Sequence, residues 1–131
     1  MKMEIKNNPK MNIKREKIED ILKDISKNVR EIFLLFISEN LIDLKKIEFK
    51  GDLESNIKQK IEDAIKDRYQ NMNETFSELR KSGVDLGVLN FKLVMIPLKI
   101  KVFLATYEKK DAENVINRIK DIENEINKVK N

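Results

Sequence analysis

Residues 85–107 read DLGVLNFKLVMIPLKIKVFLATY, and most of these side chains are apolar. The apolar positions recur every three or four residues, which is the period of an α-helix. They form two series, Leu86, Leu89, Leu93, Ile96, Ile100, Phe103 and Tyr107, and Val88, Phe91, Met95, Leu98 and Val102. At about 100° per residue the two series lie on roughly opposite sides of a helix. A helix that is apolar on two opposite sides has to bury both of them.

The same segment also has one feature of a β-hairpin. Residues 98–102, LKIKV, alternate strictly between apolar and charged side chains and include branched residues that favour strands. However, Pro97 is disfavoured inside a strand, and no Gly or Asn turn interrupts residues 91–107. We therefore predict a helix, with a kink where Pro97 lacks an amide hydrogen and crowds the Leu93 carbonyl.

The two opposite apolar series raise the question of what covers the second one. One alternative is a central position inside a bundle of this chain's own helices, and the other is a surface shared with another chain. We favour the second alternative. The predicted partner interface consists of Val88, Phe91, Met95, Leu98 and Val102. We expect either a homo-oligomer, with a dimer favoured, or a complex with another helical protein.

Outward from this segment, the sequence predicts three more helices. The first covers residues 14–46, and the pattern breaks near Ser38. The second begins after a cap at Asp52 and ends before Gly83. The segment described above is the third helix of the chain, with a cap at Asp85. The fourth begins after a cap at Asp111 and runs to about residue 130. With three Gly and two Pro in 131 residues, turns are few. We predict an all-α fold, an elongated four-helix bundle of two long and two shorter helices, in one domain over residues 14–131.

The last helix has a narrow apolar series, Val115, Ile119, Ile122, Ile126 and Val129. Such spacing is typical of a helix that packs against one neighbour, as in a coiled coil. Because the series covers only two heptads, we favour an outer helix of the bundle over a free-standing coiled coil.

Positive charge collects in two places. Residues 1–17 and residues 86–110 each carry a net charge of +4, and the whole chain also carries +4. Residues 1–13 are predicted to be a flexible basic arm. An alternative function follows, in which the arm and Lys92, Lys99, Lys109 and Lys110 contact the phosphates of a nucleic acid. The support is weak, because arginine is rare and acidic residues are interspersed.

The residues of an ordinary active site are missing from this sequence. It has no His and no Cys, so the commonest general base, the thiol nucleophile and the usual zinc ligands are absent. We therefore predict no enzyme activity, no catalytic residue, no cofactor and no metal, although a carboxylate-only metal site stays open. Membrane binding is not expected, because an interfacial helix needs one polar face. Residues 1–12 include no apolar signal segment, and we expect a cytoplasmic protein.

Overall fold

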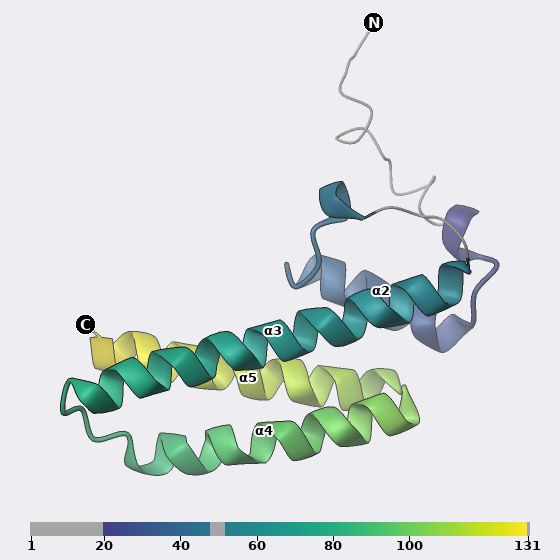
Figure 1. Cartoon of the computed structure of the whole chain (residues 1–131). Coiled ribbons are helices and arrows are strands. Elements are labelled where there is room, and N and C mark those ends of the chain that lie inside the picture. The colour runs from purple at the N-terminus through teal and green to yellow at the C-terminus, as the bar shows by residue number, and fades with distance from the viewer. Residues whose placement is uncertain (1–19, 48–51, 131) are drawn as a thin grey trace, which may run out of the picture. The chain divides into compact units, whose positions relative to one another are not determined.

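The computed structural model describes residues 20–47 and 52–130, which are mostly helical and contain no strand (Figure 1). Its elements are α2 (Lys27–Ser38), the short 3₁₀ helix η1 (Leu44–Lys46), α3 (Leu53–Lys81), α4 (Gly87–Thr106) and α5 (Lys109–Lys130). The all-α prediction is confirmed, and the segment after Asp85 is a helix and not a hairpin. The predicted basic arm at residues 1–13 lies outside the described residues. The four-helix bundle stays a prediction.

The single long helix predicted over residues 14–46 is wrong for the part that the structure describes. Residues 20–22 are helical, a turn follows, and α2 begins only at Lys27. Ser26 stands before α2 with an extended backbone, ψ 149°, and its amide donates to the Glu54 carboxylate at 2.8 Å. The apolar spacing did not reveal this break, because Leu22, Ile25 and Val29 on both sides of it are all buried.

Two helices end in the same hydrogen-bonded motif. Asn40 after α2 and Gly83 after α3 both have a left-handed backbone, with φ of 61° and 84°. The following amides, of Leu41 and Val84, donate to carbonyls five residues back, at 2.9 and 3.0 Å. This is the Schellman arrangement, in which the left-handed residue satisfies carbonyls at the helix end. The break in the apolar pattern near Ser38 coincides with the end of α2, and the predicted role of Gly83 is confirmed.

The beginning of α3 agrees with the sequence. The Asp52 carboxylate accepts the amide of Ser55 at 3.4 Å and the hydroxyl of the same residue at 3.0 Å. A carboxylate in this position satisfies an amide that has no partner within the helix. The predicted cap of α3 at Asp52 is therefore confirmed.

The chain forms two compact units, Met1–Ile61 and Glu62–Asn131. In the first unit, α2 has no fully exposed residue in its apolar stretch 32–37. Ile32, Phe33 and Phe36 are buried there, and the other three are half-buried. Ile57 and Ile61 on the first turns of α3 are also buried. The single domain over residues 14–131 stays a prediction.

The second unit contains the rest of α3 together with α4 and α5, and each of these helices runs antiparallel to the one before it (Figure 1). Helices α4 and α5 pack against each other. Their buried side chains are Leu89, Leu93, Ile96, Ile100 and Phe103 of α4, and Ala112, Val115, Ile116, Ile119, Ile122 and Ile126 of α5. From α3, Ile65, Met72 and Phe76 are buried. One complete apolar series of α4 therefore belongs to the core of this unit.

The two junctions around α4 differ slightly from expectation. Leu86 occupies the cap position of α4, and the Asp85 carboxylate accepts the next amide, that of Gly87, at 3.0 Å. At the other end, α5 begins at Lys109, so the predicted cap at Asp111 is wrong. Asp111 lies in the first turn instead and accepts the hydroxyl of Thr106 at 2.6 Å. The last residue of the predicted narrow series, Val129, is exposed.

Candidate functional site

The large apolar side chains that remain exposed gather on one helix. Among residues 20–47 and 52–130 there are seven, and six of them belong to α4. Their exposed fractions run from 44% to 77%. They are Val88, Phe91, Val94, Met95, Leu98 and Val102, and we call these six the outer face of α4. All five residues of the predicted partner interface are therefore solvent-exposed in this chain.

The outer face lies opposite the buried series of the same helix. At about 100° per residue, its six side chains fall within an arc of about 120°, centred about 160° from the centre of the buried side chains. Burial of one series therefore exposes the other. The helices of this unit cover only the side of α4 that holds Ile96 and Phe103, so within the unit the outer face is not buried.

Val94 was missing from the predicted interface. It lies between the two apolar series, three residues after Phe91 and four before Leu98, and it is 69% exposed. The sequence contained a signal for it, because residues three and four apart share one side of a helix. Val94 widens the outer face toward α3.

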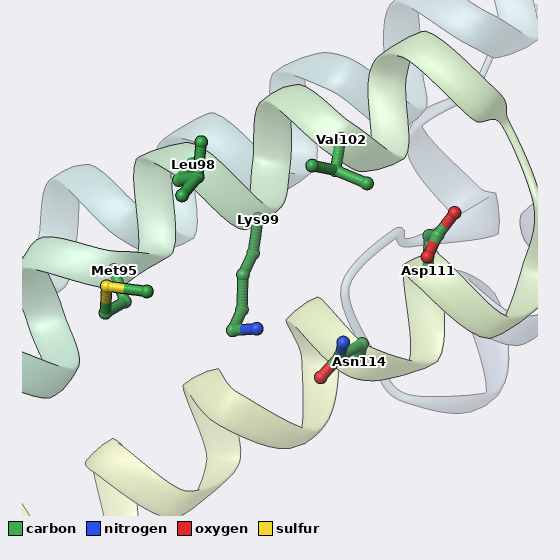
Figure 2. Close-up of a pocket in the computed structure, with 6 residues that line it drawn as sticks. All are labelled: Met95, Leu98, Lys99, Val102, Asp111 and Asn114. Carbon is green, nitrogen blue, oxygen red and sulfur yellow. The ribbon is translucent and has the colours of Figure 1, made fainter.

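Three hollows border the outer face. Two of them, of about 110 and 220 Å³, lie between α4 and α5 and share Met95 and Lys99. Figure 2 shows the smaller one, with Lys99 reaching from α4 toward α5, where Asp111 and Asn114 are placed. The third, of about 570 Å³, lies between α3 and α4 and is lined by Tyr69, Pro97 and Lys101 among others. An apolar ridge therefore stands between two grooves.

The charged side chains that line these hollows are mostly cationic. They are Lys66, Lys92, Lys99, Lys101 and Arg118, against Asp111. Lys92 pairs with Asp121 at 2.9 Å, and Lys66 pairs with Glu62 at 2.7 Å. Within the described residues, Lys99, Lys101 and Arg118 form no ion pair. Each edge of the outer face therefore carries a lysine that has no ion-pair partner within the described residues, Lys99 on one edge and Lys101 on the other.

The four lysines of the nucleic-acid alternative do not form one cluster. Lys92 is already paired with Asp121 on α5, and its side chain is only 33% exposed. Lys99 lies in the groove two turns further along α4. Lys109 and Lys110 stand at the beginning of α5, where Lys110 lies 3.5 Å from Glu108. The structure therefore places Lys92 and Lys99 beside the outer face, and of these two only Lys99 has no ion-pair partner within the described residues.

One perturbed tyrosine lies at the end of α4. Tyr107 has a left-handed backbone, φ 50°, and its ring lies 5.1 Å from that of Phe103. Burial, and to a lesser degree the charge of Glu62, raises the pKa of Tyr107 to about 12. Burial is the larger of these two causes, so the half-buried phenol stays protonated at neutral pH.

In the described ranges, no three acidic side chains are placed to hold a metal ion, and no helix is both long and apolar enough to cross a membrane. The sequence matches no protein-family model, and comparison with curated proteins and with solved structures found no match.

Proposed function

We propose that this chain is a non-enzymatic protein–protein interaction module whose working surface is the outer face of α4. The observation that supports the proposal most directly is the gathering of six exposed apolar side chains on one side of one helix. Single exposed apolar residues are common on protein surfaces, whereas a contiguous group marks a site of interaction.

The size of the outer face agrees with this role. A large apolar side chain presents on the order of 150–200 Å² when fully exposed. Exposed fractions of 44–77% then put the outer face at on the order of 600 Å². That area reaches the upper end of the largest apolar patches of monomers, about 300–600 Å², and approaches the roughly 800 Å² that each partner buries in a standard interface.

The energy available from such a contact is moderate. Burial of about 600 Å² at about 25 cal/mol per Å² yields on the order of 15 kcal/mol. Association itself costs about 4–15 kcal/mol, so only the remainder appears as affinity. The outer face therefore suits a reversible complex in which Phe91 and Met95, which are large and adaptable, contribute most.

A photo-crosslinking amino acid on the outer face tests the proposal in the cells that make this protein. Replacing Phe91 or Leu98 by p-benzoylphenylalanine should yield crosslinked products of discrete mass after irradiation. The matched control is Gln70, an exposed residue of α3 that does not belong to the outer face. If neither outer-face position crosslinks more than Gln70, the proposed function is wrong.

A second measurement separates an interface from a core. The double variant Phe91→Glu with Val102→Glu should remain folded by circular dichroism, because both side chains are exposed, and it should lose the crosslinks that a probe at Leu98 forms. Loss of folding would instead mean that the free protein buries this face, since an unpaired charge is costly to bury.

A further inference from the structure

The edges of the outer face carry information about the partner beyond the existence of an interface. The chemistry of the partner, which rests on the proposed function, is what these edges indicate. We infer that the outer face binds an amphipathic helix of another protein, whose apolar stripe is flanked on both sides by acidic residues.

The shape of the surface points to a helix. The outer face runs from Val88 to Val102, which at 1.5 Å per residue is about 21 Å, or about four helical turns. Its residues are spaced three and four apart, as on a helix that packs against another helix. Grooves border it on both sides, one between α3 and α4 and one between α4 and α5. Side chains at the edges of a helix lying along α4 would enter these grooves.

The charges in the grooves indicate which residues flank the apolar stripe of that helix. Lys99 and Arg118 line the α4–α5 groove, and Lys101 lines the α3–α4 groove. These three cations have no ion-pair partner within the described residues. Acidic residues on both edges of an incoming helix would meet them, and such charge pairs at the rim of an interface set specificity and association rate.

The same charges weigh against a second copy of this chain as the occupant. Both edges of the outer face carry a lysine, Lys99 on one and Lys101 on the other, and α4 has no acidic residue. Two α4 helices packed face to face would bring a lysine edge against a lysine edge whether they ran parallel or antiparallel. Like charges across an interface oppose association. The homo-oligomer expected from the sequence is therefore the less favoured occupant.

Two synthetic helical peptides of about 18 residues test the inference. Both carry the same leucine stripe at spacings of three and four, and the flanking positions are glutamate in one and lysine in the other. We expect the glutamate peptide to bind the full chain at least about tenfold more tightly than the lysine peptide at low salt, as measured by fluorescence anisotropy. The difference should shrink as ionic strength rises, because exposed charges are screened.

Variants of this chain identify the responsible cations. Lys99→Gln with Lys101→Gln removes two of the three cations and should abolish most of the difference in affinity between the two peptides. The matched control, Lys109→Gln with Lys110→Gln, removes the same charge from exposed residues at the beginning of α5 and should leave the tenfold difference. Phe91→Glu should weaken binding of both peptides.

Three outcomes would overturn the inference, and they are distinguishable from failure of the proposed function. If both peptides bind equally and Phe91→Glu abolishes both, the outer face is an interface without acidic preference. If sizing with light scattering shows a dimer that Phe91→Glu dissociates, the occupant is a second copy. If neither peptide binds a monomeric chain, an acidic helix is not the occupant, and the crosslinking experiment decides separately whether the face has a partner.

Discussion

Arg68 on α3 and Glu123 on α5 form an ion pair with two hydrogen bonds. The Arg68 Nε lies 2.7 Å from Glu123 Oε2, and its Nη2 lies 3.3 Å from Oε1. The two side chains are 34% and 31% exposed. The hydrogen bonding to Glu123 raises the pKa of Arg68, although partial burial opposes this. The pair joins two helices that are far apart in sequence and fixes the planar guanidinium in one orientation.

This pair should contribute measurably to the stability of the second unit. In a double-mutant cycle of Arg68→Gln and Glu123→Gln, we expect a coupling of about 1 kcal/mol, because solvent still screens a pair that is a third exposed. The measurement is urea unfolding of the four proteins. The more exposed pair of Glu62 and Lys66, four residues apart on α3, serves as a control and should couple by about 0.5 kcal/mol or less. Equal coupling of both pairs would contradict the role assigned to the fixed geometry.

The phenol of Tyr107 should lose its proton at a higher pH than an exposed tyrosine does. Its folded-state pKa is about 12, chiefly because burial disfavours the anion, whereas an unfolded tyrosine has a pKa of about 10. Between these values the folded protein keeps a proton that the unfolded chain has released. The corresponding stability is present below about pH 10 and is lost as the pH rises through 12.

The tyrosinate absorbance of a Tyr69→Phe variant checks this value, because the sequence has two tyrosines and only Tyr107 then remains. Adding Glu62→Gln should lower the midpoint only in part, since the charge of Glu62 is the smaller cause. A midpoint near pH 10 in the folded protein would show that the ring is solvated.

The two ends of α3 were the part of the fold that the sequence predicted best. Asp52 and Gly83 carry their signal locally, in a carboxylate that can bond nearby amides and in a residue that tolerates positive φ. The helical period of residues 85–107 also predicted the two opposite sides of α4. Each of these features depends on residues within a few positions of one another, so it can be read from the local sequence.

The break before α2 could not be predicted in the same way, and the choice of the Val88, Phe91 and Met95 side of α4 as the exposed one did not follow from local spacing alone. Leu22, Ile25 and Val29 continue the helical spacing through the turn, because the segments on both sides of the turn bury apolar side chains. The two series of α4 are similarly apolar, so the choice between them depends on which side α3 and α5 cover. That choice is a tertiary property, and local spacing does not contain it.

The two left-handed helix ends should respond differently to substitution. At Gly83 a methyl group would meet no atom within 4 Å, so Gly83→Ala changes only the backbone preference at φ 84°. We expect a loss of about 1–2 kcal/mol in the free energy of unfolding. Asn40→Gly should change it by less than about 0.5 kcal/mol, because asparagine tolerates this conformation. Thermal and urea unfolding of both variants provide the measurement. If Gly83→Ala proves neutral, the Schellman end of α3 is not rigid.

Two phenylalanines of α4 allow a direct test of its division into a core side and an outer face. Phe103 is fully buried and Phe91 is 77% exposed, and both lie on the same helix. Phe103→Ala should lower the free energy of unfolding by about 3–5 kcal/mol, since it removes a buried ring and leaves a cavity. Phe91→Ala should change it by about 0.5 kcal/mol or less, because the ring makes few contacts in the free chain. Urea unfolding at several protein concentrations shows whether Phe91 is covered in solution, and by which molecule. A large, concentration-dependent effect of Phe91→Ala would mean that another copy covers Phe91, and a large, concentration-independent effect would mean that this chain covers it.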